Sequence, residues 1–449
     1  MRFLPHSEAD IRAMLTAIGV ADIDALFADI PAALRQEDLL AMPPALDEQR
    51  LVAHLQALAA ANRSEEIQAS FLGAGVYAHY TPRLIEQLLN RSEFLTAYTP
   101  YQPELAQGTL KAIFEFQSMM TELLGMEVAN ASMYDGAHAC TEAVLMALRL
   151  RPKATRVWIS AALHPEYKSV LATYLAHSPV RIEEVPLRDG RTDYAALDGN
   201  DAAILVVQSP NFLGIIEDLQ AAGAACQRLG TLFGVTFCEA LAYGILQPPG
   251  AFGADIVAGE GQSLGLAPSF GGPLLGVFAS REQHLRAMPG RLVSQTTDVH
   301  GREAYVLTLA TREQHIRRAR ATSNICTNQG LMALAATIYL SLVGKGGLQT
   351  LARINFSRAE YAKSQLSALP GVSLPYASPT FNEFVIRLPG LAQDWVHFGA
   401  ERGLAVGVPL SRFGSHPAED LLVTVTEMCS AAQIDLLVAT LREWLQAQR

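Results

Sequence analysis

The sequence predicts an α/β fold with a mostly parallel sheet that helices flank on both faces. Between residues 155 and 280, short apolar runs alternate with segments of helical periodicity. The apolar runs are continuous, which is typical of strands covered on both faces. Polar turns follow several of these runs, and ligands in such folds lie beyond the carboxyl ends of the strands. We therefore expect the site to be built from those turns.

The order of elements supports this prediction. Strands are expected at residues 155–160, 182–185, 203–208, 232–238, 256–258 and 274–279, with helices at 165–175 and 219–229. The turns that should meet at one edge of the sheet are 164–167 (HPEY), 208–214 (QSPNFLG), 238–244 (CEALAYG) and 259–265 (GEGQSLG). Four polar turns at one edge predict a cofactor cleft.

Two further regions flank this domain, which we expect to span residues 66–329. Residues 1–65 predict an N-terminal helical arm, because Ser7 is a good N-cap and apolar residues recur behind it with helical spacing. Such arms often wrap a partner subunit. Residues 330–449 predict a helix followed by alternating strands and helices, a small C-terminal α+β domain.

Composition excludes several classes of function. The net charge of −10 argues against nucleic acid and against an anionic membrane surface as partners. The N-terminus has acidic residues where a signal peptide needs an apolar core, and the apolar run at 330–344 is too short to span a bilayer. The five cysteines are widely spaced without a CxxC motif, which predicts a cytoplasmic protein with no zinc site.

The segment 98–104 (YTPYQPE) predicts an extended loop, because two prolines so close together exclude a regular helix or a central strand. It carries Tyr98, Tyr101, Gln102 and Glu104. It is either a structural connector or a loop presented to a small polar ligand.

Three other features are weaker signals. A helix that begins after Asp135-Gly-Ala could bind phosphate at its N-terminus, although many strand–turn–helix units look similar. Arg312, Arg317, Arg318 and Arg320 predict a solvated helix face, with an anionic ligand or an acidic partner as the alternative. Cys326 has no paired base nearby in the sequence, so we expect no nucleophilic role for it.

The turn at 259–265 contains Glu260, Gln262 and Ser263 but no lysine. The five lysines of the chain lie elsewhere, at Lys111, Lys153, Lys168, Lys345 and Lys363. None of them follows a strand with an acidic residue before it. This matters because in pyridoxal-phosphate enzymes of the aspartate-aminotransferase type a similar stretch presents the lysine that binds the cofactor covalently.

Several motifs together carry a resemblance that covers about residues 65–345. They are YTPYQPE, ASMYDGAHACTEA, HPEYKSVLATY, QSPNFLGIIED, GADIVAGEGQSLG, SFGGPLLG, MPGR and REQHIRRARATSNICTNQGLMALAATIYLSL. The sequence resembles the alpha chains of two-subunit glycine decarboxylases, the P-proteins of the glycine cleavage system. The resemblance implies the fold of type I pyridoxal-phosphate transferases, and an α₂β₂ assembly whose lysine belongs to the beta chain.

The resemblance gives several turn residues a place in a vestigial cofactor cleft. Ser263 stands where the lysine is expected, and Glu239 where an aspartate would contact the pyridine nitrogen. His164 stands where a residue would stack on the ring, and Asn211 belongs to the same cleft. His138 departs from the family, which usually has a small residue there, and disfavours a phosphate site. The implied cofactor, pyridoxal phosphate, is therefore expected on the beta chain and not covalently on this one.

The resemblance also implies a role in a shared active site. Glycine would be decarboxylated on the beta chain, and the aminomethyl group passed to the lipoyl H-protein. This chain, inactive alone, would contribute Tyr98, Tyr101, Gln102 and Glu104, with Thr322, Ser323 and Asn324 directed toward the phosphate.

Three alternatives stay open at this point. The chain could be a scaffold that only assembles partners, or it could form homodimers without a beta chain. A lysine-independent enzyme acting alone is disfavoured by Glu239 and His138.

Overall fold

The computed structural model describes residues 5–36, 41–62, 66–414 and 416–448. The chain divides into two compact units, residues 1–64 and 65–449.

The described residues of the first unit form helices and turns. Helix α1 (Glu8–Ile18) begins at a capping box between Ser7 and Asp10 and ends at Gly19, whose left-handed conformation suits a glycine. Helix α2 (Glu48–Ala60) begins at Asp47. Among the described residues of this unit no side chain is buried, and apolar residues such as Phe27, Leu55 and Leu58 are exposed.

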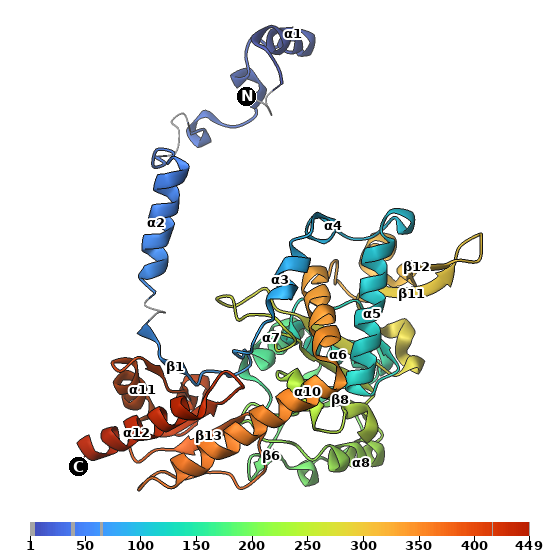
Figure 1. Cartoon of the computed structure of the whole chain (residues 1–449). Coiled ribbons are helices and arrows are strands. Elements are labelled where there is room, and N and C mark those ends of the chain that lie inside the picture. The colour runs from blue at the N-terminus through green and yellow to red at the C-terminus, as the bar shows by residue number, and fades with distance from the viewer. Residues whose placement is uncertain (1–4, 37–40, 63–65, 415, 449) are drawn as a thin grey trace. The chain divides into compact units, whose positions relative to one another are not determined.

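The second unit is built on a seven-stranded sheet in the order β2-β10-β9-β8-β7-β3-β4 (Figure 1). The strands are β2 (Val128–Ala129), β3 (Arg156–Ser160), β4 (Arg181–Val185), β7 (Ala202–Gln208), β8 (Leu232–Phe237), β9 (Ile256–Glu260) and β10 (Gly276–Ser280). Strands β4, β3, β7, β8 and β9 are parallel, whereas β10 runs antiparallel to both of its neighbours. The predicted mostly parallel sheet is confirmed.

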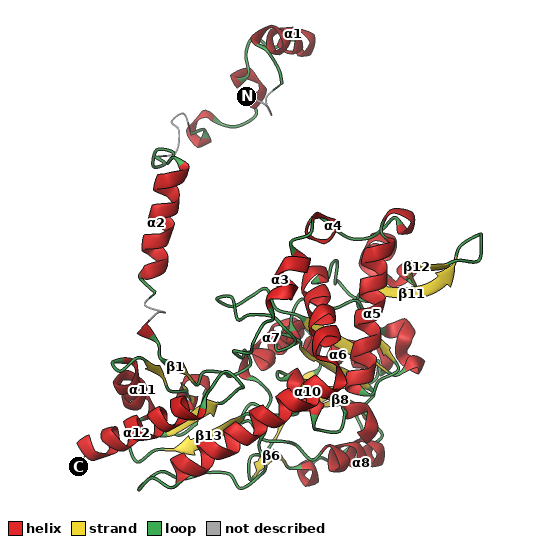
Figure 2. Cartoon of the chain, viewed as in Figure 1, coloured by secondary structure: helices red, strands yellow, loops and turns green. Residues whose placement is uncertain are grey.

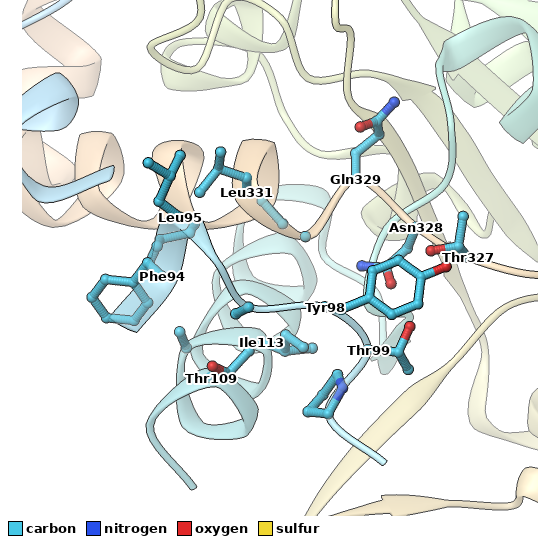
Figure 3. A pocket seen from close by; sticks show the side chains of 16 residues that line it. Phe94, Leu95, Tyr98, Thr99, Thr109, Ile113, Thr327, Asn328, Gln329 and Leu331 are labelled. Atoms are coloured by element: carbon cyan, nitrogen blue, oxygen red, sulfur yellow. The ribbon is translucent and has the colours of Figure 1, made fainter. Parts of the chain in front are cut away.

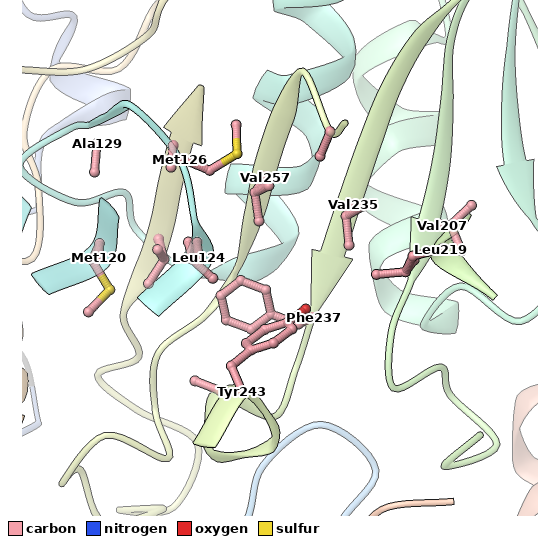
Figure 4. Packing of buried hydrophobic residues seen from close by; sticks show 14 of the residues in the cluster. Met120, Leu124, Met126, Ala129, Val207, Leu219, Val235, Phe237, Tyr243 and Val257 are labelled. Atoms are coloured by element: carbon pink, nitrogen blue, oxygen red, sulfur yellow. The ribbon is translucent and has the colours of Figure 1, made fainter. Parts of the chain in front are cut away.

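Helices cover both faces of this sheet (Figure 2). The helices of the unit are α3 (Arg83–Leu89), α4 (Ser92–Leu95), α5 (Gln107–Leu124), α6 (Gly136–Leu150), α7 (Pro165–Leu175), α8 (Leu219–Leu229), α9 (Gln314–Arg317), α10 (Gly330–Ser367), α11 (Ala392–Ala400) and α12 (Ala431–Ala447). Alternate residues of β7 separate into two cores. Leu205 and Val207 pack with α5, α8 and α10, and Figure 4 draws part of that cluster. Ile204 and Val206 pack with α6 and α7 on the other face. Because both faces are buried, the central strands β7 and β8 consist mostly of apolar or small residues.

A second, antiparallel sheet lies in the C-terminal part of the unit. It contains β13 (Glu383–Arg387), β16 (Asp420–Thr424) and β15 (Val408–Pro409), in that order. The short pair β1 (Ala69–Ser70) and β14 (Leu404–Ala405) joins the start of the unit to this region. Two-stranded pairs form from β5 (Leu187–Arg188) with β6 (Arg191–Thr192), and from β11 (Leu292–Thr297) with β12 (Glu303–Thr308).

Helix α10 connects the two sheets. By length and composition alone it is apolar enough to cross a membrane. Its helical geometry is interrupted at Gly344, however, so each part is shorter or more polar than a span requires. Ala335, Ala336 and Tyr339 are buried in the core of the large sheet, and Ala359 and Ala362 in the core of the small one. These are the features of a core helix.

The turn after β7 touches the C-terminal sheet at Gly214. This residue has a φ of +79°, and a Cβ atom there would lie 2.1 Å from the backbone oxygen of Glu383. Only glycine allows both this backbone conformation and this close approach.

We therefore expect Gly214→Ala to cost about 3 kcal/mol of stability or more, from backbone strain and overpacking together. Gly301→Ala is the matched control, since Gly301 has a φ of +77° but nothing within 4 Å of its Cβ position. It should cost only about 1–2 kcal/mol. Urea unfolding followed by tryptophan fluorescence measures both, and equal losses would contradict the close approach at Gly214.

Candidate functional site

The four predicted turns meet at the carboxyl edge of the large sheet. The backbone N–H of His164 donates to Oε1 of Gln208 at 2.8 Å, and the hydroxyl of Tyr243 donates to the backbone oxygen of Ser209 at 3.0 Å. The backbone N–H of Ala240 donates to Oγ of Ser263 at 3.1 Å. The expected convergence is confirmed, and Ser263 is fully buried within it.

A segment of the same chain, residues 73–79, lies in the cleft between these turns and the C-terminal sheet. Tyr77 and Gln262 exchange two hydrogen bonds, from Tyr77 N to Oε1 at 2.9 Å and from Nε2 to Tyr77 O at 3.0 Å. The Tyr77 hydroxyl donates to Oε2 of Glu383 at 2.7 Å, and Ala74 N donates to Oε1 at 2.8 Å. We call residues 73–79 the filling segment, because it is bonded to both walls.

The ring of His164 lies under the filling segment. Its Nε2 is 2.9 Å from the backbone oxygen of Ala74, and a Cβ atom on Gly75 would come within 2.7 Å of that same nitrogen. The edge of the Phe212 ring contacts it from another side. Burial lowers the pKa of His164. The Nε2 edge of the ring is therefore occupied by the chain's own backbone.

The carboxylate of Glu239 is also engaged by internal partners. Its Oε2 is 2.9 Å from Nε2 of His79 and accepts a hydrogen bond of 2.7 Å from Asn382. Nδ1 of His79 is 2.8 Å from Glu427. Burial disfavours a charged imidazole, but the two carboxylates outweigh it and raise the pKa of His79 to about 10. His79 is therefore an imidazolium that bridges Glu239 and Glu427.

The N-terminus of α6 binds side-chain carboxylates of this chain. Gly136 N donates to Oε2 of Glu260 at 2.9 Å, and His138 N donates to Asp135 at 2.8 Å. Glu260 also accepts from the backbone of Gln262 and Leu275. The His138 ring is partly exposed, bonded to Asp135, and directed toward Tyr134 and Tyr174. Two of the amide groups that could hold a phosphate, those of Gly136 and His138, are already paired.

Asn211 has a structural role in the turn after β7. Its side chain donates to Gly190 O and to Glu217, and its Oδ1 accepts from the backbone of Leu213 and Ile215. It is fully buried, so no hydrogen-bonding group is left for a ligand.

Pyridoxal phosphate does not fit these residues. Ser263 offers a buried hydroxyl where an amine would be needed. Glu239 and the start of α6 are paired internally, and the filling segment covers His164. No step of a reaction is assigned to this cleft.

The side chains of the loop 98–104 are mostly exposed, unlike those of the cleft. Tyr98 is 81% exposed, Gln102 and Glu104 are exposed, and none of these three side chains makes a hydrogen bond within the part of the chain that the structure describes. Tyr98 lines a pocket of about 240 Å³ between this loop, α5 and residues 327–334. Figure 3 shows Tyr98 beside Thr327 and Asn328 at that pocket.

The other predicted loop lies at a second pocket, of about 410 Å³. Thr322, Ser323 and Asn324 line it together with Arg149 and Arg318. Arg317, Arg318 and Arg320 are exposed, as expected for a solvated face. Arg312 is not: it is buried and donates to Met288 O and Gly290 O, so the prediction of a solvated side chain was wrong there.

Two residues at the centre of these contacts were missed from the sequence. His79 follows a glycine-rich stretch and has no acidic residue beside it in the sequence, so nothing indicated a buried ion pair. Arg291, which contacts Tyr101, ends the MPGR motif, and a lone arginine after Pro-Gly carries no signal of its partners.

The His79 bridge predicts a pH dependence of stability. A folded pKa of about 10 against an ordinary 6.5 stabilises the fold fully below pH 6.5, and this is lost as the pH rises through 10. His79→Gln leaves two buried carboxylates without a cation, at a cost of about 3–5 kcal/mol. Its deficit against wild type should therefore be largest near pH 6 and shrink toward pH 10.

Thermal melting at pH 6, 8 and 10 measures this difference. His300→Gln, at an exposed histidine, is the control and should match wild type throughout. A deficit that stays constant with pH would show that His79 is not charged in the fold.

Comparisons with known proteins agree with this architecture. The family model of the glycine cleavage system P-protein matches residues 1–441. A probable glycine dehydrogenase (decarboxylating) subunit 1 from Geobacillus kaustophilus is 49% identical, covering 97% of this chain and 98% of its own length. The protein of the same name from Desulfotalea psychrophila is 45% identical, over 99% of both chains.

Solved structures give the same result. A crystal structure of glycine decarboxylase (P-protein), in inhibitor-bound form, superimposes with a TM-score of 0.89 at 42% identity, covering 99% of this chain and 100% of that one. A sphingosine-1-phosphate lyase from Burkholderia pseudomallei reaches a TM-score of 0.65 at 18% identity, over 93% and 94% of the two chains. That likeness shows the fold alone, which is that of type I pyridoxal-phosphate enzymes. The chain belongs to the glycine cleavage system P-protein family.

Proposed function

We propose that this chain is the lysine-less alpha subunit of a glycine decarboxylase, and that it completes the active site of a second subunit. That second subunit, the beta chain, would hold pyridoxal phosphate and bind glycine. The cofactor supplies the electron sink for decarboxylation, and the aminomethyl group then passes to the lipoyl H-protein. We infer an α₂β₂ assembly.

The observation that carries this proposal is the contrast between the two regions of this chain. Its own cleft is filled and hydrogen-bonded from within, with Ser263 in place of a lysine. Tyr98, at the pocket, and Gln102 and Glu104, further along the same loop, are exposed and have no hydrogen-bond partner among the described residues. Polar groups on an ordered loop that lack internal partners suit a ligand or a neighbouring chain.

Within this proposal each loop has its own task. Tyr98, Tyr101, Gln102 and Glu104 orient glycine and exclude water at the beta subunit's site. Thr322, Ser323 and Asn324 offer hydroxyl and amide donors to the cofactor phosphate. The residues of the vestigial cleft, among them His164, Asn211 and Glu239, serve only the fold of this chain.

A cytoplasmic setting is part of the proposal. Every cysteine of the chain is free, and four of the five are buried, which fits a reducing compartment.

A scaffold that only assembles its partners is the competing function. It requires no particular side chains at 98–104, so substitution there distinguishes the two. We expect Tyr98→Ala and Gln102→Ala to lower glycine decarboxylation by the assembled enzyme about tenfold to a hundredfold each, because transition-state hydrogen bonds are lost. Assembly should be unchanged by size-exclusion chromatography.

Tyr80→Ala is the matched control, since Tyr80 is also an exposed tyrosine but lies outside the loop and the pocket. Unchanged activity in Tyr98→Ala and Gln102→Ala would contradict the shared active site and support the scaffold function.

The location of the cofactor is tested by absorbance. This chain alone with pyridoxal phosphate should give no visible band of a lysine-bound cofactor, and the band should appear once the second subunit is added. A band from this chain by itself would mean that one of its five lysines binds the cofactor, against the proposal.

The N-terminal unit should bind a partner subunit. Leu51, Leu55 and Leu58 share one exposed face of α2. Replacing all three by serine should weaken assembly with the second subunit at least about tenfold, because each leucine contributes about 1.5–3 kcal/mol when buried. Gln49→Ser with Gln56→Ser is the control on the same helix. Equal affinity of both variants, measured by calorimetry, would argue against this role.

A further inference from the structure

We propose that Arg291 is a positioning residue that holds the loops 98–104 and 326–329 in one fixed geometry, so that Tyr98 and Gln102 reach the neighbouring subunit's site. This inference rests on the proposed function and assigns the control of that site's geometry to a single guanidinium group.

The backbone of Arg291 is fixed against the large sheet. Its carbonyl oxygen accepts a hydrogen bond of 2.9 Å from Ala131 N, just after β2. The preceding Gly290 has a φ of +74°, and a Cβ there would come within 2.8 Å of the side chain of Asn130. The turn therefore has little freedom, and the arginine side chain, only 4% exposed, leaves it in a defined direction.

The guanidinium group joins the two loops directly. Nη2 donates to the hydroxyl of Tyr101 at 2.9 Å and to the backbone oxygen of Cys326 at 2.5 Å, while Nη1 lies 3.5 Å from Oδ1 of Asn328. Its central carbon also lies 5.4 Å from the centre of the Tyr101 ring. A planar fork of donors can satisfy partners on two segments at once, which a lysine ammonium cannot do in the same geometry.

The charge of Arg291 is balanced from the remaining side. Oε2 of Glu313 is 3.5 Å from Nε, and both side chains are buried. The group thus contacts Tyr101, the backbone oxygen of Cys326, the side chain of Asn328 and Glu313. Its surroundings suit a structural tie and leave no open face for a substrate anion.

Both of these loops line the pocket in Figure 3. Tyr98, Thr99 and Pro100 line it from one loop, and Thr327, Asn328 and Gln329 from the other. Asn328 is further held by Ala131 O and Ser132 Oγ, each at 3.1 Å. Loop 326–329 is therefore anchored to the sheet independently. Arg291 joins loop 98–104 to loop 326–329 through its hydrogen bond to Tyr101.

The test uses the assembled two-subunit enzyme with glycine as substrate. We expect Arg291→Gln to lower kcat about thirtyfold to a hundredfold, because misplacement of about 1 Å costs about that much. The KM for glycine should change less than about threefold and assembly should stay at wild type, while the melting temperature should fall because buried Glu313 loses its cation. Arg188→Gln is the control. Arg188 is exposed, is paired with Asp193, and is far from Arg291 in the sequence.

A double variant separates positioning from a general structural role. In a Tyr98→Ala, Gln102→Ala background, Arg291→Gln should cost less than about threefold more, since the groups it positions are gone. A full thirtyfold loss in that background would overturn the inference. A wild-type kcat in Arg291→Gln, together with a large loss of activity in Tyr98→Ala, would also overturn the inference. That result would still support the proposed function.

Failure of the proposed function looks different. Tyr98→Ala and Gln102→Ala would then retain full activity, and this inference would fall with it. If Arg291→Gln does not assemble, Arg291→Lys takes its place, because it keeps the charge beside Glu313. A kcat about tenfold below wild type supports the tie, and wild-type kcat overturns it.

Discussion

The buried imidazolium of His79, held between Glu239 and Glu427, is the interaction on which the rest of this subunit depends. It fixes the end of the filling segment to the turn after β8 and to the loop after β16 at the same time. Tyr77, two residues earlier, is fixed in the same way to Gln262 and Glu383. Together these contacts join the large sheet to the C-terminal sheet through a segment that belongs to neither.

A filled cleft changes what the fold can do. Buried carboxylates are costly unless they are paired, so the polar groups at this edge of the sheet need partners from within the chain. Here Glu239 is paired with His79 and Asn382, and Glu260 with three backbone N–H groups. The polar groups of the cleft therefore stabilise the chain itself.

Much of the fold could be predicted from local pattern. The strands of the large sheet were found because continuous apolar runs such as AILVVQ are specific for strands buried on both faces. The meeting of the four turns followed from parallel topology. The partners of individual side chains could not be predicted from local pattern. His79 and Glu427, for example, are 348 residues apart, and their pairing depends on how two sheets pack. Arg312 was misjudged for the same reason, since neighbouring arginines look alike in sequence.

The sequence by itself determined that this is an α/β chain of the P-protein family without a lysine in the turn after β9. Both conclusions depend only on residue type and order, which a chain carries with it before folding. The tertiary structure alone decided that residues 73–79 occupy the cleft between the four turns and the C-terminal sheet, and that Arg291 joins two loops. Those facts depend on distances between segments far apart in the chain, and such distances exist only once the cores on both faces of the sheet have formed.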